Sequence, residues 1–310
     1  MMRIYIILLI CSFSFADYFG GYPGSSFRYA SNARQMALGN SIISEYNQGF
    51  NAFSNPALLS KTKKYEFGAS YFLMTLDRYV QVLSITRNLE KSAGTSLSLF
   101  RSGVKDIEGK DLYNQSTGSF DSSESYIMFS FGNNIIESLD FGFNIKAIFN
   151  NIENYKASGV SADIGLIYNF SEQLNMALMI HNIYGKYSWN DLGKDESLPM
   201  IGSIGLKYGW HDNITLFSRI DYMQPENINL YRFRSGIELN RSNYEIRFGL
   251  IQSSGISADN TLAIENGIKD FKILLGFGVN INKFLKLDFC IDFGVENEGI
   301  NNLISVSFIN

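Results

Sequence analysis

The stretch Ser138–Phe149, with the sequence SLDFGFNIKAIF, decides the predicted fold class. Its residues alternate strictly between apolar and mostly polar side chains. The first set is Leu139, Phe141, Phe143, Ile145, Ala147 and Phe149, and the second is Asp140, Gly142, Asn144 and Lys146. Successive side chains of a β-strand point to opposite faces, so the two sets lie on opposite faces. The alternation is as long as a strand tilted across a bilayer core, which takes about 9–11 residues.

The same two-residue period continues along the chain after Tyr65. Two further clear examples are the segments 158–170 and 284–294. Reading each alternating segment as a strand predicts fourteen: 65–73, 79–88, 94–102, 123–132, 138–149, 158–170, 173–182, 200–209, 213–222, 231–239, 243–252, 270–281, 284–294 and 300–309. Fourteen is an even number, as expected for a barrel in which every strand is antiparallel to its neighbours.

The connections between these segments alternate in length. Every second connection is a short turn, whereas the others include all the long loops, at 103–122, 183–199, 223–230 and 251–268. Outer-membrane barrels have short turns on the periplasmic side and longer loops outside. Closure into a barrel also removes the open edges of a sheet. The sequence therefore predicts an all-β fold, a 14-stranded antiparallel transmembrane β-barrel.

A large soluble β-sandwich or propeller is the structural alternative, because its strands alternate too. Soluble strands are shorter, about six residues, and a propeller would show a repeat of about 40–50 residues, which the sequence lacks. In a barrel, the polar faces of 213–252 would point into the lumen as cross-strand neighbours of mixed sign. The predicted lumen-facing charges are Arg219, Asp221, Arg232, Arg234, Glu238, Glu245 and Arg247.

The N-terminal part of the chain differs from the strands. Residues 1–16 combine Arg3, an apolar run and a small-x-small end at Ser14–Ala16, which predicts a cleaved signal peptide. Lipidation at Cys11 is disfavoured, because Ile10 before it is not small. Residues 17–64 are too irregular for a wall strand and too apolar for a tail, which predicts a hatch folded inside a barrel of residues 65–310. Asn55, Pro56 and Ala57 are its predicted structural turn.

Composition narrows the class of protein. The 310 residues are 45% hydrophobic and 18% charged, which excludes a disordered chain. No apolar run of about 18 residues follows the N-terminus, which argues against a helical membrane protein. The net charge of -4 predicts no nucleic-acid partner. After removal of the signal peptide only Cys290 remains, which leaves no disulfide and no cysteine-based metal site.

Catalytic and cofactor sites find little support. His181 and His211 are far apart in the predicted barrel, so a nucleophile–histidine arrangement is not expected, and His181 is interpreted as a hydrogen-bonding lumen residue. Gly276-Phe277-Gly278 lacks a third glycine and lies within a strand, which rejects a dinucleotide site. The acidic residues Asp106, Glu108 and Asp111 lack EF-hand spacing and are interpreted as a solvated loop. We predict no enzyme, no cofactor and no metal.

Several segments together resemble the PorV/PorQ family, which belongs with FadL-like outer-membrane proteins. The resemblance starts from Ser31–Asn40, SNARQMALGN, followed by Asn55–Leu59, NPALL. Three later segments add to it: Gly118–Asp121, Asn144–Phe149 and Ala162–Tyr168. The stretch before Asn55 and the final Asn310 depart from the family pattern. The resemblance implies a fourteen-stranded barrel with an N-terminal hatch in the outer membrane of a Gram-negative bacterium.

For function, the resemblance implies an accessory of type IX-like protein secretion that receives secreted cargo and contacts secretion-machinery proteins. The first alternative is a FadL-like uptake channel for hydrophobic small molecules, which predicts an apolar pocket against the hatch and a break in the hydrogen bonding of the wall. The second alternative is a structural envelope barrel, which predicts a lumen filled by the hatch and by paired charges. Outer-membrane lipid is an expected partner in all three cases.

Overall fold

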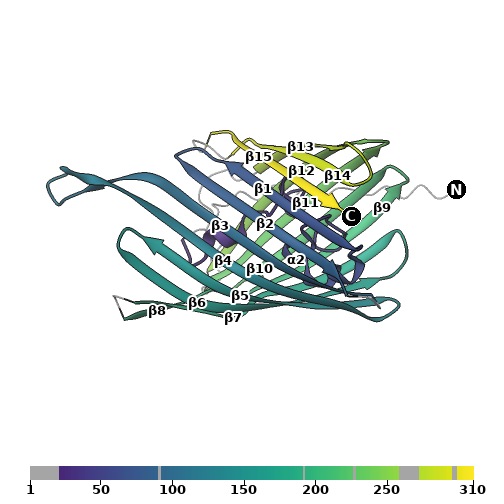
Figure 1. Ribbon diagram of the computed structural model, residues 1–310, viewed down its shortest axis with the longest axis horizontal. Helices are drawn as coiled ribbons and strands as arrows, with labels where there is room; N and C mark the ends of the chain where they lie inside the picture. Colours follow the sequence, from purple (N-terminus) through teal and green to yellow (C-terminus); the bar gives the residue numbers. More distant parts are fainter. Residues whose placement is uncertain (1–20, 90–91, 191–192, 226–227, 258–271, 295–298) are drawn as a thin grey trace.

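The computed structural model describes residues 21–89, 92–190, 193–225, 228–257, 272–294 and 299–310. The predicted signal peptide lies outside these residues. The described strands form one closed antiparallel barrel (Figure 1), and a short fifteenth strand, β8, is attached to β7 alone. The predicted 14-stranded barrel is therefore confirmed.

Each barrel strand pairs with the strands before and after it, and β1 pairs with β15 to close the ring. The bounds are β1 Tyr65–Leu73, β2 Arg78–Asn88, β3 Ala93–Lys110, β4 Ser116–Ile136, β5 Leu139–Ile152, β6 Tyr155–Asn169, β7 Leu174–Trp189, β8 Lys194–Ser197, β9 Ile201–His211, β10 Ile214–Met223, β11 Ile228–Arg241, β12 Tyr244–Ser257, β13 Lys272–Asn280, β14 Leu285–Asp292 and β15 Asn301–Ile309. Most of the predicted strand ends agree with these within a few residues.

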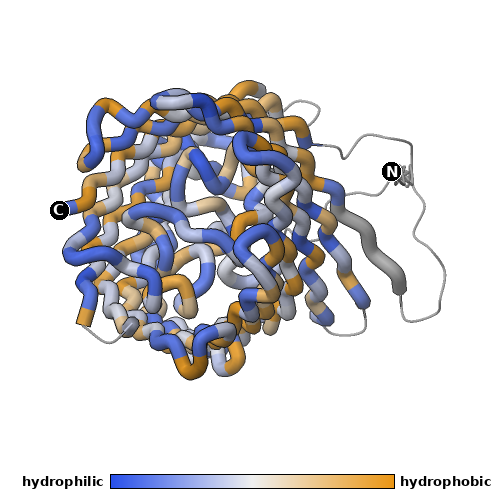
Figure 2. Tube along the Cα trace, turned by 90° about the vertical axis from the view of Figure 1, so that its right-hand side faces the viewer, coloured by the Kyte–Doolittle hydropathy of each residue, from blue (hydrophilic) through white to orange (hydrophobic). Residues whose placement is uncertain are grey.

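The two faces of the wall are inverted relative to a soluble protein. Outward side chains are large and apolar, for example Leu97 (58% exposed) and Ile145 (54% exposed), whereas Asp140 and Asn144 are buried inside. Figure 2 shows this alternation as orange and blue along each strand. An apolar exterior around a polar interior is the pattern of a barrel in lipid. The wall therefore spans a membrane, and the soluble sandwich is excluded.

Two of the predicted long loops are strands over much of their length. The segment 103–122 continues β3 to Lys110 and starts β4 at Ser116, and the resulting ribbon projects beyond the rest of the barrel (Figure 1). The segment 183–199 continues β7 to Trp189 and contains β8. Beyond the lipid both faces of a ribbon meet water, so these extensions lack the apolar alternation that marks the other strands.

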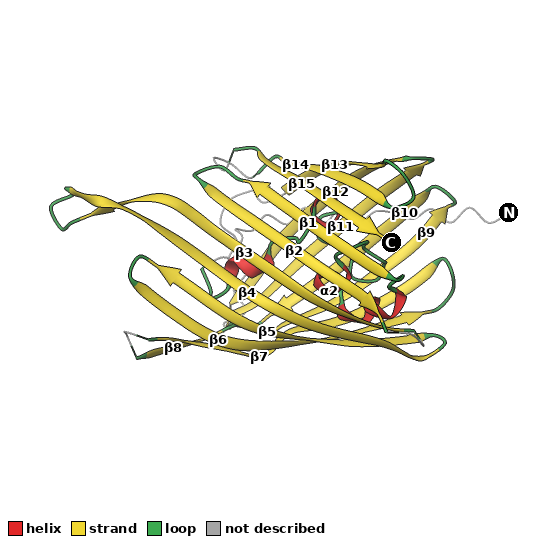
Figure 3. Ribbon diagram, viewed as in Figure 1, coloured by secondary structure: helices red, strands yellow, loops and turns green. Residues whose placement is uncertain are grey.

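The first described part of the chain, residues 21–64, lies inside the barrel and is called the N-terminal segment (Figures 2 and 3). Its helices are η1 Ser25–Arg28, α1 Ala33–Ala37, α2 Asn51–Ser54 and η2 Pro56–Lys61. Helix α1 packs against β12–β15 and η2 packs against β2–β6. No helix among the described residues is long and apolar enough to cross a membrane.

Glycines on the lumen side of the wall let the N-terminal segment approach the strands. A Cβ atom on Gly142 would overlap Pro56 and Ala57, and one on Gly249 would overlap the backbone of Leu38 and Gly39. The same close approach occurs at Gly68, Gly94, Gly132, Gly165, Gly205, Gly236 and Gly276. Nine strands thus each carry a glycine where the N-terminal segment approaches the wall closely. These glycines lie toward the end of the barrel that carries the short turns.

Candidate functional site

Two adjoining cavities lie in the lumen, against the N-terminal segment. The larger, called the vestibule, has a volume of about 480 Å³ and is lined by strand ends at the long-loop end of the barrel, including Arg78, Val104 and Lys272. The smaller, called the inner cavity, has a volume of about 70 Å³ and reaches His181 and Asn182 in the wall. The residues shared by both linings are Arg28, Tyr29, Asn40, Arg232 and Arg234. The two cavities therefore adjoin each other, and together they are called the path.

Four of the predicted lumen charges lie at this path. Asp221 accepts hydrogen bonds from Nε of both Arg219 and Arg234, the latter at 2.7 Å, and from Ser203 Oγ at 2.7 Å. Arg219 and Arg234 lie opposite each other on β10 and β11, and Asp221 lies opposite Arg232. The carboxylate of Asp221 thus lies between two guanidinium groups that would otherwise repel each other.

A second ionic group completes the inner cavity. Lys146 Nζ lies 2.7 Å from Asp163 Oδ2 and also contacts the Tyr126 ring, 5.4 Å from its centroid. His181 bridges the two groups, because its Nδ1 lies 4.0 Å from Asp163 Oδ2 and its Nε2 lies 3.5 Å from Arg219 Nη2. His181 thus lies in the lumen, and Asp163 accepts three hydrogen bonds, from Lys146 Nζ, Asn144 Nδ2 and the Asn182 backbone N–H.

The wall is interrupted beside the inner cavity. Ala162 pairs with Tyr184 and Ile164 with Ile180, so Asp163 alone faces the three residues His181–Ile183, called the β7 bulge. Asn182 at its centre has φ 55°, in the left-handed region. A bulge leaves extra residues without ladder partners and bends its strand.

On the edge of β7 that faces β9, the strand pairing also ends at the bulge. Pairing with β9 ends at His181 opposite Ile201, and farther along β7 pairs with β8 instead. Side-chain bonds fill the gap: Asn182 Nδ2 donates to the Pro199 carbonyl at 3.1 Å, and Ser161 Oγ donates to Asn182 Oδ1 at 2.9 Å. At this place the wall is closed by the Asn182 amide and by one backbone bond, from the Leu198 N–H to the Gly185 carbonyl at 2.9 Å, rather than by a regular ladder.

The other three predicted charges lie closer to the short turns and hold α1. Glu238 accepts two bonds from Arg34 and one from Arg247, at 2.7–2.8 Å. Arg247 also donates to Asp288 at 2.7 Å and to Glu245, which Lys286 contacts as well. Burial alone lowers the pKa of the Arg34 guanidinium, but Glu238 beside it raises that pKa above its ordinary value. Three cations and three carboxylates balance in this network.

The predicted turn Asn55–Ala57 joins the N-terminal segment to the wall. Asn55 Oδ1 accepts from the Ala57 backbone N–H at 3.0 Å, and its Nδ2 donates to the carbonyls of Ile43 (3.1 Å) and Leu166 (3.4 Å). Pro56 begins η2, where its missing N–H costs no helical hydrogen bond. These three residues lie outside both cavity linings, and their hydrogen bonds hold the turn against the wall.

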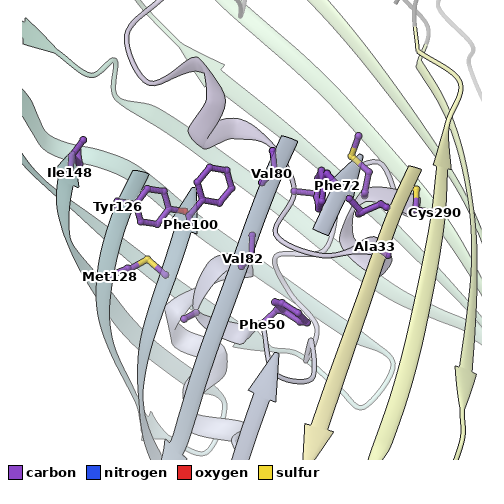
Figure 4. Packing of buried hydrophobic residues seen from close by; sticks show 14 of the residues in the cluster. Ala33, Phe50, Phe72, Val80, Val82, Phe100, Tyr126, Met128, Ile148 and Cys290 are labelled. Carbon is purple, nitrogen blue, oxygen red and sulfur yellow. The ribbon is translucent and has the colours of Figure 1, made fainter. Parts of the chain in front are cut away.

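Aromatic side chains form the other side of the inner cavity. Phe27 meets Tyr126 edge-on with ring centroids 5.0 Å apart, and Tyr126 stacks on Phe100 at 5.1 Å. Figure 4 shows Phe100 and Tyr126 side by side within the buried cluster that also holds Ala33 and Cys290. Phe27, Phe53 and Tyr126 line the inner cavity directly. The path therefore has an apolar side and a cationic side.

The remaining sequence candidates lie elsewhere. Asp106 and Glu108 are on the projecting ribbon, and Asp111 Oδ1 accepts from the backbone N–H groups of Tyr113 and Gln115, which shapes the turn at its tip. His211 ends β9, and Gly276–Gly278 lies within β13. The described residues contain no group of three or more His, Cys, Asp or Glu that could hold a metal ion.

Sequence reasoning missed Lys146, Asp163 and Asn182 as members of the site. Lys146 lies on the polar face of the segment that decided the fold, and the turn after Ile152 sets its register beside Asp163. Counting residues back from that turn could have predicted the pair. The bulge had no such signal, although the predicted strand 173–182 ends within it.

The fold and the cavities together define a class of protein: a transmembrane barrel of fourteen strands with a lumen filled at one end and open to a path at the other. No family model matches the chain, and no curated protein matches it. Solved structures do. The CymD monoaromatic hydrocarbon channel is 12% identical over 91% of this chain and 98% of its own, with a TM-score of 0.69. The Pseudomonas putida toluene transporter TodX is 15% identical over 90% and 98%, with a TM-score of 0.67.

A Pseudomonas aeruginosa FadL homologue is also similar, with 10% identity, coverage of 89% and 97%, and a TM-score of 0.61. At these identities the likeness concerns the fold, which is that of FadL-like outer-membrane barrels. It supports the FadL-like part of the predicted resemblance and gives no support to the PorV/PorQ part.

Proposed function

We propose that this protein is a FadL-like uptake channel in a bacterial outer membrane, through which small molecules with an apolar part enter the barrel from outside. The observation that carries the proposal is the path, two adjoining cavities that reach from the long-loop end of the barrel to the β7 bulge. The fold is shared with proteins described as a toluene transporter and a monoaromatic hydrocarbon channel. That likeness supports transport rather than enzymatic chemistry.

The N-terminal segment makes a straight passage through the barrel unfavourable. It is held from several strands: Ser70 Oγ donates to the Ser31 carbonyl at 2.6 Å, and Asn144 Nδ2 donates to the Ala52 carbonyl at 3.2 Å. Glu66 accepts from Tyr46 Oη at 2.8 Å and from the Gly49 backbone N–H at 2.9 Å. We propose that this segment is a fixed hatch and that the molecule leaves through the wall at the β7 bulge.

One prediction of the uptake hypothesis agrees with the structure, and a second agrees in part. It predicts a break in the wall ladder, and the pairing around Asp163 is broken. It also predicts a pocket against the N-terminal segment; the inner cavity lies there, although its lining mixes aromatic and charged groups rather than being apolar throughout. The paired charges around Glu238 are also what a purely structural role predicts, so they do not distinguish it from uptake. Protein secretion stays a prediction without an observation of this kind.

The test is uptake of radiolabelled toluene and, in parallel, of radiolabelled benzoate by intact Gram-negative cells that express the protein, with the wall or the hatch locked in turn. A cysteine pair replacing Asn182 and Pro199, whose side chain and carbonyl are in contact, would close the bulge when oxidised. A pair replacing Ala33 and Ser305, which are hydrogen-bonded, would tie α1 to β15. Both variants carry Cys290→Ala.

We expect the oxidised wall pair to abolish uptake and a reductant to restore it, whereas the oxidised hatch pair leaves uptake unchanged. The opposite result would place the route through the N-terminal segment. If expression adds no uptake in either redox state, the transport proposal is wrong. In that case secreted proteins that co-purify with the barrel, identified by mass spectrometry, would support the secretion hypothesis.

A further inference from the structure

Cations outnumber carboxylates among five paired ionic side chains at the inner cavity. Lys146, Arg219 and Arg234 share two carboxylates, those of Asp163 and Asp221, so these five side chains carry one positive charge in excess. All five are buried, with exposures of 8% or less. Burying an unbalanced charge is costly unless a counter-charge lies nearby. The network at Glu238, by contrast, is balanced, so the excess belongs to the cavity.

Free hydrogen-bond donors also outnumber free acceptors among these five side chains. Asp163 and Asp221 each accept three hydrogen bonds, which leaves these carboxylates little room for a donor on a ligand. Arg234 uses Nε toward Asp221 and Nη1 toward the Gly39 carbonyl, and no described residue accepts a bond from its Nη2. A guanidinium carries five N–H donors, so the site offers donors and lacks acceptors.

The volumes of the two cavities suit two different parts of one ligand. The inner cavity, at about 70 Å³, is smaller than the roughly 150 Å³ that accommodates benzene. The vestibule, at about 480 Å³, falls within the roughly 300–1,000 Å³ of small-molecule sites and adds Met36, Met74 and Ile251 to its lining. A small charged group fits inside, and a compact apolar body fits in the vestibule beside Tyr29.

We infer that this path binds an organic monoanion with a compact apolar body, such as an aromatic carboxylate, rather than a neutral hydrocarbon. The anionic group lies between Lys146, Arg219 and Arg234, where it compensates the excess charge and accepts the remaining N–H donors. A hydrocarbon would have to desolvate these cations without offering an acceptor. The inference rests on the proposed uptake function for its purpose, but binding itself can be measured without transport.

The experiment is isothermal titration of the purified barrel in detergent with benzoate, benzamide and toluene, which share a ring and differ in charge and polarity. We expect benzoate to bind at least tenfold more tightly than benzamide and toluene. Inorganic phosphate at the same concentration tests for the charge alone, and we expect it to bind more weakly than benzoate because it lacks the apolar body. Equal affinity for toluene and benzoate, or tighter binding of phosphate, would overturn the inference.

The variant Arg234→Gln tests the site directly. It removes the excess cation and leaves Arg219 paired with Asp221, so the lumen stays balanced. We expect at least a tenfold loss of benzoate affinity and no change for toluene. Should that variant fail to fold, Arg219→Gln, which leaves Arg234 on the same carboxylate, is expected to give the same loss. The matched control is Lys207→Gln, a lumen lysine paired with Glu45 that lies outside both cavity linings.

The outcomes separate this inference from the proposed function. Benzoate binding that depends on Arg234, without any uptake by cells, would keep the inferred site and refute the channel. Uptake of toluene through the wall, with benzoate bound no better than toluene, would keep the channel and refute the inferred ligand class. Arg234→Gln with unchanged benzoate affinity would refute the site, provided that the folded protein shows its usual anomalous mobility on an unheated gel.

Discussion

Glu238 is a wall residue that joins the N-terminal segment to a second strand through two buried cations. It is 3% exposed and accepts bonds from Arg34 on α1 and Arg247 on β12. Breaking a buried ion pair costs about 3–5 kcal/mol, because the remaining partner is left uncompensated. At the scale of the residue, the attachment of the N-terminal segment is therefore mainly a matter of buried charges that must stay paired.

Glu238→Gln is expected to destabilise the barrel by about 3–5 kcal/mol, because Arg34 and Arg247 lose the charge between them. The measurement is urea unfolding in lipid vesicles. The double variant Arg34→Gln/Glu238→Gln should lose less than the sum of the two single losses, since the residues are coupled. Additive losses would mean that the pair contributes nothing as a pair.

Tyr46 makes the stability of the folded protein depend on pH in the alkaline range. Burial, followed by the nearby Glu66 carboxylate, raises the pKa of the Tyr46 phenol above its ordinary value near 10. A raised folded-state pKa stabilises the protein fully below the unfolded pKa and loses that contribution as the pH rises above it. We expect the stability of the natural protein to fall more steeply above pH about 10 than that of Tyr46→Phe, as followed by urea unfolding. Parallel curves would show that Tyr46 does not contribute.

At the scale of the element, how closely each strand approaches the N-terminal segment matters more than its length. Gly142 on β5 lies against Pro56, whereas a Cβ on Gly202 of β9 would have no atom within 4 Å. These two glycines form a natural comparison, because both belong to long barrel strands.

Gly142→Val is expected to destabilise the barrel by about 1–3 kcal/mol or displace η2, because overpacking forces the backbone to shift. Gly202→Val should leave stability nearly unchanged. Urea unfolding of both variants measures the contrast. Equal losses would show that strand propensity, and not the contact with Pro56, decides.

The projecting ribbon of β3 and β4 is expected to be dispensable for folding. Residues from Lys105 to Asp121 extend past the last pairs with β2 and β5, at Val104 and Ser122. Replacing this ribbon by a short turn should preserve the folded mobility on an unheated gel and the binding of benzoate. Loss of the folded band would mean that the ribbon guides closure of the barrel.

Much of this fold is predictable from residues such as Phe141, Phe143 and Ile145, because the lipid imposes a strict alternation on every strand it touches. The lumen charges from Arg219 to Arg247 follow from the same alternation. The projecting ribbon was not predictable as strand, since water on both faces imposes no pattern on it. The pairing of Lys146 with Asp163 depends on register, and the β7 bulge depends on one residue in a rare conformation, so neither follows from periodicity alone.

At the scale of the whole molecule, one end of the barrel is sealed by buried pairs and the other is accessible through the vestibule. Beside the inner cavity, Asn182 bridges the interrupted pairing of the described wall. We expect Asn182→Ala to raise the uptake of apolar probes several-fold in intact cells, because the amide bridge to Pro199 is lost. Unchanged uptake would argue against a route at the bulge.

Cys290, the free thiol among the described residues, is fully buried on β14 in the same cluster as Ala33 and Ala37 of α1. The molecule thereby carries its own reporter for the hatch. A thiol reagent added to the folded protein can modify Cys290 only when α1 lifts away from the wall. The rate of Cys290 labelling thus measures how often α1 leaves the wall, and no cysteine has to be introduced.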